Sequence, residues 1–411
     1  DGEMQIGNVK IETENPSEHI RQILADYKSP RFAYLPSFTG GLVGYFSYDY
    51  LGYSEPSVRC RVEDSEAFKD VDLMLFDKVI AYDHLKQKIC IIVNMKTDRV
   101  MENYGEATAE IAKIAAMIKN ASIPEFPKEI ENINFTCNVS KEEYCSVVEK
   151  TKEYIKDGDI FQAVISRQFT SPMKGSLLNA YRVLRTTNPS PYMVYLHFDE
   201  EELMSSSPET LVRLQNGRLT TFPVAGSRPR GKNREEDEEL ERDLLSDEKE
   251  LSEHNMLVDL GRNDLGRISK FGSVDVTKYM MIHRYSKIMH ICSQVESEIE
   301  SSKDGLDAIE AVLPAGTLSG APKIRACEII EELESEERGI YGGALGYLDF
   351  AGNLDTCIAI RMAVKKDDKV YVQAGGGIVA DSVPEKEYEE SANKAAAVMQ
   401  AIQNAEEVDE V

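Results

Sequence analysis

The chain has 411 residues, of which 42% are hydrophobic and 29% charged, and these proportions are typical of a globular protein with a large buried core. Its 72 acidic residues outnumber the 47 basic residues, and the net charge of −25 argues against nucleic acid or an anionic membrane as the main partner. No apolar run approaches the roughly 18 residues of a membrane span, and no signal peptide is recognisable.

Seven cysteines are scattered along the chain, and no two of them form a Cys-x-x-Cys pair. An odd number without such pairs predicts neither a disulfide framework nor a zinc site. The pattern fits a reducing compartment, so we expect a cytoplasmic protein.

The first 120 residues are expected to form short strands, turns and one helix. Residues 38–49 combine glycines and aromatic residues in a way that is typical of twisted, closely packed strands. Further elements are expected to be strands at 71–82 and 89–94 and a helix at 101–118. Residues 120–137 have no clear period and contain Pro124 and Pro127, so we interpret them as a linker.

A helix with clear boundary signals follows the linker. Ser140 and Glu143 have capping-box spacing, and Gly158 is placed to end the helix. Residues 231–250 are dense in acids and bases, and we expect an exposed loop that enters a helix. The other expected elements are strands at 160–170, 193–198, 210–214, 219–222, 343–349, 356–364 and 370–375 and a final helix at 386–403. This mixture predicts an α+β fold with two packed, mostly antiparallel β-sheets and helices on the outside.

Two Glu-x-x-Glu pairs lie far apart in the chain, Glu250 with Glu253 and Glu387 with Glu390. Their spacing places both carboxylates of a pair on one face of a helix. If the two faces met across a cleft, their oxygens would suit Mg²⁺. On spacing alone, two solvated helix faces are the simpler interpretation, but the polar, glycine-rich surroundings favour a site.

Three glycines, Gly375, Gly376 and Gly377, end a predicted strand just before the second acidic pair. They would allow a backbone turn whose N–H groups bind a carboxylate or phosphate, and a strand bulge is the alternative. No Gly-x-Gly-x-x-Gly opens a helix, and the lysine in 316–323 is displaced from its Walker position. A nucleotide-binding enzyme is therefore disfavoured.

Two further side chains are candidates for chemistry. His290 could act as a general acid or base, although a histidine between apolar neighbours is more often structural. Arg361, at the end of the strand-like residues 356–360, could bind a carboxylate with two hydrogen bonds, and a surface ion pair is the alternative.

Four long motifs, in this order, resemble those of the chorismate-utilising enzymes, and most closely the large subunits of anthranilate synthase. The resemblance extends from about Gly40 to the C-terminus, and the motifs lie at 223–231, 250–264, 314–323 and 375–390. It implies the fold of that family, with an N-terminal region at 1–120 and a chorismate-binding catalytic domain at 138–405. The expected activity is that of a Mg²⁺-dependent lyase.

The resemblance also implies roles for the acidic pairs. Glu253 and Glu390 would ligate Mg²⁺, and Glu250 and Glu387 would hold metal-bound waters or transfer protons. The metal would bind the ring carboxylate of chorismate, which reconciles an acidic protein with an anionic substrate. Other substrate contacts are implied for Arg361, Tyr341, Gly226, Ser227, Thr317, Gly375, Gly376 and Gly377. Ammonia would add at ring carbon 2 with loss of the 4-hydroxyl, and pyruvate elimination, served by His290, would leave anthranilate.

Two positions distinguish close relatives within the family. Related aminodeoxychorismate synthases usually carry a nucleophilic lysine where this chain has Ala225. Isochorismate and salicylate synthases use a lysine to activate water at the position of Gln162. Neither residue present here can do that chemistry, so ammonia is the expected nucleophile. The alternatives kept open are an aminodeoxychorismate synthase component I and a catalytically inactive homologue.

The resemblance further implies partners and regulation. No cysteine lies in a glycine-flanked nucleophile turn, so a separate glutamine amidotransferase subunit is expected to supply ammonia. Pro191, Tyr192 and Met193 match half of a site for the feedback inhibitor L-tryptophan. Family members usually begin several tens of residues earlier, with strands and the other half of that site, and we expect such a segment to be missing here.

Overall fold

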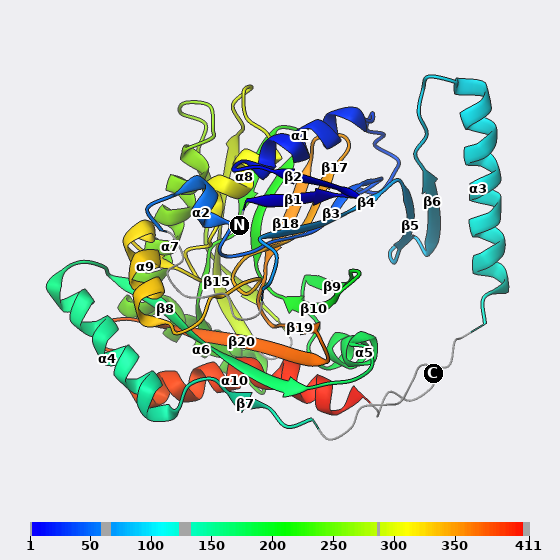
Figure 1. Cartoon of the computed structure of the whole chain (residues 1–411). Coiled ribbons are helices and arrows are strands. Elements are labelled where there is room, and N and C mark those ends of the chain that lie inside the picture. Colours follow the sequence, from blue (N-terminus) through cyan, green and yellow to red (C-terminus); the bar gives the residue numbers. More distant parts are fainter. Residues whose placement is uncertain (1, 59–66, 123–132, 286–287, 406–411) are drawn as a thin grey trace.

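The computed structural model describes residues 2–58, 67–122, 133–285 and 288–405, and two large antiparallel sheets dominate it (Figure 1). The first sheet runs in the order β16 (Gly320–Ala321), β8 (Gln162–Pro172), β20 (Lys369–Ile378), β19 (Met362–Lys366), β10 (Glu201–Ser207) and β9 (Tyr192–His197), with β7 (Thr136–Cys137) also paired to β8. Residues 123–132, with both linker prolines, lie outside the described residues.

The second sheet contains nine strands in the described chain. Its order is β13 (Val224–Pro229), β15 (Ile288–Glu298), β12 (Arg218–Thr221), β11 (Thr210–Gln215), β18 (Leu354–Ile358), β17 (Ala344–Asp349), β3 (Gly41–Phe46) and β4 (Val71–Phe76), with β14 (Asp275–Arg284) paired to β15. A separate small hairpin joins β1 (Glu3–Ile6) to β2 (Val9–Glu12).

The two large sheets pack face to face, and helices cover their outer sides. Side chains of β3, β9, β10, β17, β18 and β19, among them Tyr45, Leu203 and Leu345, form the buried layer between the sheets. The helices are α1 (Pro16–Asp26), α2 (Leu51–Ser54), α4 (Lys141–Asp157), α5 (Leu178–Thr187), α6 (Arg234–Ser246), α7 (Glu248–Gly266), α8 (Gly305–Val312), α9 (Lys323–Leu333) and α10 (Pro384–Gln403). The predicted fold class is therefore confirmed.

On the outer side of each sheet, the apolar faces of helices pack against the strands and form a further hydrophobic core. Helices α5 and α10 cover β20 through residues such as Leu184 and Val398, whereas α7 and α8 cover the second sheet. Helix α4 has the predicted capping box between Ser140 and Glu143, and it ends at Gly158 in a left-handed conformation. Strands β3 and β4 come from the N-terminal range 1–120 yet belong to the second sheet. The division into two domains remains a prediction.

Three predicted elements were wrong in their extent. Residues 71–82 form two strands, β4 and β5 (Lys78–Asp83), which belong to different sheets. Residues 356–364 are split between β18 and β19, because Arg361 has a positive φ of 49° that ends the extended run. Residues 231–250 are largely helical, since Asn233 caps α6 and three acids in its first turn favour the positive end of the helix dipole.

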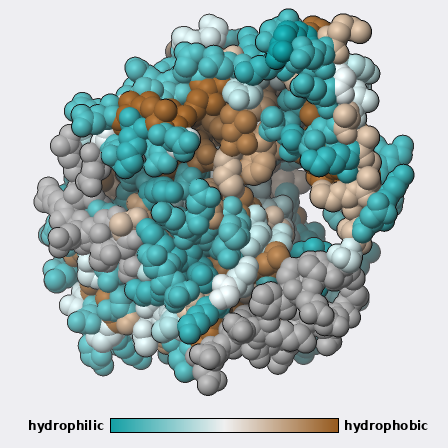
Figure 2. All heavy atoms as spheres, turned by 45° about the vertical axis from the view of Figure 1, so that its right-hand side comes forward, coloured by the Kyte–Doolittle hydropathy of each residue, from teal (hydrophilic) through white to brown (hydrophobic). Residues whose placement is uncertain are grey.

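One unit stands apart from the sheets. Strand β5 pairs with β6 (Lys88–Val93), and α3 (Val100–Asn120) packs along β6 (Figure 1). The hairpin leaves Ile80, Tyr82 and Ile89 about half exposed. The face of the molecule in Figure 2 is mostly hydrophilic, and its hydrophobic residues gather around a hollow.

Replacing Leu345 by alanine should destabilise the fold, because Leu345 is fully buried between the two sheets. We expect the free energy of unfolding to fall by about 2–5 kcal/mol, measured by urea denaturation. Leu245→Ala, at a position on α6 that is 38% exposed, is the matched control and should cost less than about 1 kcal/mol. Equal losses in the two variants would contradict the inter-sheet core.

Candidate active site

The four predicted glutamates come together from two helices. Glu250 and Glu253 lie on α7, which packs on β13 and β15, and Glu387 and Glu390 lie on α10. Burial, followed by the negative charge of Glu250, raises the pKa of Glu253, and Glu390 contributes to the same effect. Burial is also the first cause of the raised pKa of Glu387, with Glu390 again adding repulsion. The two acidic faces therefore influence each other electrostatically, as the sequence predicts.

A lysine that the sequence reasoning missed lies among these carboxylates. Lys394, one turn after Glu390 on α10, places its Nζ 2.8 Å from Glu390 Oε1 and 3.1 Å from the Gly375 carbonyl oxygen. Its charge also opposes the pKa increases of Glu253, Glu387 and Glu209. The only sequence signal for Lys394 was its position four residues after Glu390, which favours an ion pair on a helix. Such pairs are common on solvated helices, so the spacing alone did not indicate a functional residue.

The three glycines form an extended strand rather than the predicted turn, and the alternative bulge is absent as well. Gly375, Gly376 and Gly377 continue β20 and pair with β8 without a register shift. Strand β19 pairs with β20 only from Lys369 to Val372. The edge of the glycine segment that faces away from β8 therefore has no strand partner in the described chain. Side chains here would crowd the site, because a Cβ on Gly376 would lie 3.1 Å from Glu387 Oε2 and one on Gly377 would overlap the Gln162 amide.

A second positive charge, Arg361, lies near Tyr341, which itself contacts the Gly375 backbone. Arg361 occupies the left-handed turn between β18 and β19, and it makes no ion pair with a carboxylate within the described ranges. Burial lowers its pKa, while the neighbouring Tyr341 opposes that change. Burial raises the pKa of the Tyr341 hydroxyl to about 12, and a hydrogen bond from the Gly375 backbone partly offsets this. An unpaired guanidinium beside a hydroxyl can bind an anion.

His290 faces the same region from β15. Its Nδ1 lies 3.2 Å from the Gly226 carbonyl oxygen, which can only accept, so Nδ1 carries the proton and Nε2 is left as the basic nitrogen. Burial, and secondarily the charge of Arg361, lowers the pKa of His290. The imidazole is therefore neutral near pH 7 and available as a base.

The short strand β13 brings three predicted residues beside the first acidic pair. Gly226, with a φ of 75°, lies in a bulge between Ala225 and Ser227. A Cβ added to Gly226 would stand 3.1 Å from Glu250 Oε2, which explains why only glycine fits here. Ser227 pairs with His290 across β13 and β15.

A second missed residue is Glu209, which follows β10. Its Oε1 accepts a hydrogen bond of 3.0 Å from the Thr317 hydroxyl, the predicted substrate contact. Enclosure of the carboxyl group raises the pKa of Glu209 to about 7. A carboxylic acid that retains its proton near neutral pH can act as a general acid. A lone glutamate between two strands carries no motif of its own, so sequence reasoning had no signal for it.

Gln162, at the start of β8, is buried and presents an unused acceptor. Its Oε1 has no hydrogen-bond partner among the described residues, and its amide group lies against Gly377. A buried carbonyl oxygen without a partner is costly unless a ligand or water satisfies it. The structure thus places a predicted nucleophile-discriminating residue next to the glycine segment.

The partial tryptophan site is not brought to these residues. Pro191 precedes β9, which lies at the far edge of the first sheet. Tyr192 donates a 2.7 Å hydrogen bond to Asp355, and the Met193 sulfur accepts one from the Ser190 backbone. A role in tryptophan binding remains a prediction.

The carboxylates fit Mg²⁺ by their chemistry. No group of three or more His, Cys, Asp or Glu side chains in the described ranges is arranged to hold a metal ion by itself. Mg²⁺ commonly uses one or two carboxylates, completed by water and substrate oxygens. Glu253 and Glu390, one from each helix, can supply such a pair, and their mutual repulsion would be relieved by a cation.

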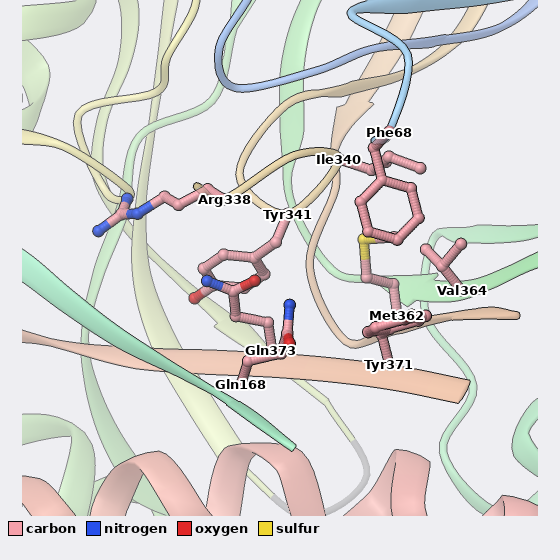
Figure 3. Close-up of a pocket in the computed structure, with 9 residues that line it drawn as sticks. All are labelled: Phe68, Gln168, Arg338, Ile340, Tyr341, Met362, Val364, Tyr371 and Gln373. Atoms are coloured by element: carbon pink, nitrogen blue, oxygen red, sulfur yellow. The ribbon is translucent and has the colours of Figure 1, made fainter. Parts of the chain in front are cut away.

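A small cavity adjoins the site behind Tyr341, and Figure 3 shows its lining. Its volume of about 20 Å³ admits a molecule of the size of water and is too small for a larger substrate. The cavity is lined by Phe68, Gln168, Arg338, Ile340, Tyr341, Met362, Val364, Tyr371 and Gln373.

Replacing Glu209 by glutamine should change how stability depends on pH. Because the folded-state pKa is raised from 4.5 to about 7, the protonated carboxyl stabilises the fold at low pH and this contribution is lost as pH rises through 7. Between pH 4.5 and pH 7, the free energy of unfolding of the wild type should therefore fall by up to about 3 kcal/mol relative to that of Glu209→Gln. Urea unfolding at a series of pH values measures this difference. A pH-independent difference would contradict the raised pKa.

Comparison with known proteins shows which family the chain belongs to. Residues 3–400 match the family described as chorismate binding enzyme. The chain is 51% identical over 404 residues to "Anthranilate synthase component 1" of Acetivibrio thermocellus, covering 96% of this chain and 81% of the relative. It is 49% identical over 404 residues to the protein of the same name from Aquifex aeolicus, covering 97% of this chain and 82% of that relative. The described helices include none long and apolar enough to cross a membrane.

Solved structures show the same relationship. Anthranilate synthase component I from Streptococcus pneumoniae superposes with a TM-score of 0.86 at 37% identity, covering 97% of this chain and 88% of that one. The isochorismate synthase MenF of Escherichia coli, at 19% identity and a TM-score of 0.69, shares the fold, over 94% of this chain and 100% of that one. The resemblance inferred from the motifs is confirmed, and the chain belongs to the family of chorismate-binding enzymes.

Proposed function

We propose that this chain is the chorismate-binding component of an anthranilate synthase, which converts chorismate and ammonia to anthranilate and pyruvate. The observation that carries the proposal is the arrangement of an acidic cluster from α7 and α10 and the unpaired Arg361 around the open edge of the glycine segment. A substrate with two carboxylates needs two cationic positions, and a bound metal and Arg361 would provide them. The names of the relatives at 51% and 49% identity favour this reading over an aminodeoxychorismate synthase.

Mg²⁺ is the proposed cofactor. Glu253 and Glu390 would hold it, with Glu250 and Glu387 beside them for its waters or for protons. When bound, the ion would neutralise and orient the ring carboxylate of the substrate. Lys394 already balances Glu390 and would offer a second positive group to the same carboxylate.

Arg361 and Tyr341 would bind the enolpyruvyl carboxylate. The left-handed turn at Arg361 is backbone strain of the kind that occurs at functional sites. The open backbone edge at Gly375, Gly376 and Gly377 would bring the substrate close to N–H donors. Gly226, Ser227 and Thr317 would complete the cleft from the other sheet and from the 314–323 motif.

Ammonia would be positioned by Gln162. Its free Oε1 is an acceptor that suits an N–H donor, and a glutamine cannot activate water as a base. Ala225 is buried beside the site and offers no nucleophile, which disfavours the route through an enzyme-bound intermediate. Both residues therefore support direct attack by ammonia at ring carbon 2.

Two groups would transfer protons. Loss of the 4-hydroxyl requires a proton donor, and Glu209 is the described carboxyl whose pKa of about 7 suits that role. Pyruvate elimination requires a base for the hydrogen at ring carbon 2, and the unprotonated Nε2 of His290 can accept it.

A separate glutamine amidotransferase would supply the ammonia. The buried cysteines here are unsuited to attack glutamine, because burial raises the pKa of Cys292 to about 11 and that of Cys357 to about 12. The six cysteines that the structure describes are free thiols, which supports a reducing, cytoplasmic location. Feedback inhibition by tryptophan at Pro191, Tyr192 and Met193 is the regulatory part of the proposal.

The direct test is an assay of the purified chain with chorismate, Mg²⁺ and either ammonium or glutamine. Anthranilate fluorescence should appear with ammonium, increase with pH as more neutral ammonia is present, and require the partner when glutamine is the donor. Glutamine-dependent turnover by the chain alone would overturn the division between subunits. An amino product that becomes aromatic only after a lyase is added would indicate an aminodeoxychorismate synthase, and no chorismate consumption would indicate an inactive homologue.

Glu390→Gln should lower kcat/KM on the order of 100-fold at ordinary Mg²⁺ because one ligand charge is lost. The side chain is 54% exposed, so the melting temperature should change by less than about 3 °C. Glu389→Gln, an exposed neighbour on the same helix, is the control and should retain activity. Near-normal turnover of the Glu390 variant would exclude it as a ligand.

His290→Ala should slow pyruvate elimination by about 100-fold or more while affecting amination less, because only elimination uses the free Nε2. The amino intermediate should then accumulate and be visible by chromatography. His283→Ala, its exposed cross-strand neighbour, should produce no intermediate. Equal slowing of both steps would assign His290 a structural role.

A further inference from the structure

We propose that Arg167 is a positioning residue that sets the orientation of Glu387 and Glu390. Arg167 lies on β8 beneath α10, and it is one of the largest fully buried side chains of the protein, with 2% of its surface exposed. Among the described residues it makes no hydrogen bond or ion pair with either glutamate. The proposal rests on the function proposed above, because it concerns the metal-binding carboxylates of that site.

The guanidinium holds α10 at two points. Arg167 Nε donates a 2.9 Å hydrogen bond to the Ser391 hydroxyl, and Nη2 donates one of 2.6 Å to the Tyr388 carbonyl oxygen. The Tyr388 ring stacks on the same group, with its centroid 3.7 Å from Cζ. The rings of Phe169 and Tyr144 lie further out, at 4.9 and 5.4 Å, and complete an aromatic enclosure.

The charge of Arg167 has no acidic partner. Its contacts are a hydroxyl, a carbonyl, aromatic rings and the Cys137 sulfur at 3.8 Å, and the described chain gives it no ion pair with a carboxylate. Burying an unpaired cation is costly, and an apolar side chain of similar volume would fill the same space without that cost. Filling this space does not require arginine. Fixing the position of α10 does favour it, because the guanidinium makes two directional hydrogen bonds to the helix.

The contacted residues are the sequence neighbours of the functional ones. Tyr388 follows Glu387 and Ser391 follows Glu390, so each contact constrains a residue directly beside a cleft carboxylate. In an α-helix, adjacent residues differ by about 100° around the axis, so fixing the inner pair determines where the outer pair points. Two contacts one turn apart restrict both rotation and sliding of the helix.

Arg167 also couples the helix to the glycine segment. It pairs with Ala374 across β8 and β20, and the adjacent pair is Ser166 with Gly375. A single side chain thus relates α10, which carries two carboxylates, to the strand that presents the substrate-binding backbone. Its loss should loosen the metal site without removing any ligand, as for other groups that orient metal ligands.

Binding of Mg²⁺ to the purified chain, followed by isothermal titration calorimetry, tests this proposal. Arg167→Lys retains the charge but loses the planar stack and the second contact, and we expect the Kd for Mg²⁺ to rise about 10-fold or more. Ser391→Ala removes one contact, is the milder variant if Arg167→Lys fails to fold, and should raise the Kd less. In both variants, saturating Mg²⁺ should restore most of kcat, because no ligand is lost.

Val398→Ala provides the matched control. Val398 is fully buried on the same helix but remote from the carboxylates, so its substitution should lower the melting temperature while leaving the Kd unchanged. A wild-type Kd in folded Arg167→Lys and Ser391→Ala, or an equal change in Val398→Ala, would overturn the positioning role. If the wild type itself does not bind Mg²⁺, the proposed metal site fails instead.

Discussion

The pairing of β8 with β20 is the contact on which the candidate site depends. It extends from Pro172 opposite Lys369 to Ala163 opposite Ile378 without a register shift. Since a slip of one residue would turn every side chain to the other face, this register decides that Arg167 points to α10. The same register places the glycine segment beside Gln162. The pairing of β8 with β20 therefore fixes both the contact of Arg167 with α10 and the position of the glycine segment.

Electrostatics then decides what the site can bind. A chain with a net charge of −25 repels an anionic substrate unless cations are concentrated locally. Lys394 lies among the carboxylates and Arg361 lies near Tyr341, each at a place where burial or neighbouring charge shifts the pKa of nearby groups. A bound divalent cation would complete this local reversal of charge. With such an ion bound, an acidic protein would be compatible with an anionic substrate.

Sequence patterns predicted α3, α4, α10, many of the strands and the acidic pairs, because those features repeat with a fixed period or match long motifs. They did not predict α1 or α5. They misjudged 71–82 and 356–364 because alternation continues while the strand changes its sheet, as at Arg361. They missed Glu209 and Lys394 because the importance of each comes from partners distant in sequence, such as Thr317 and Gly375. The glycine segment does lie at the end of a strand, as predicted, but its extended conformation comes from pairing with β8.

The long separation between paired strands affects how the molecule is made. Strand β3, near the N-terminus, pairs with β17, and β8 pairs with β20. Each early strand has one neighbour close in the chain, β4 for β3 and β7 for β8, but its other edge stays without a partner until β17 or β20 has been synthesised. Such high contact order favours slow folding, and the cleft can form only once the last strand and helix have been released.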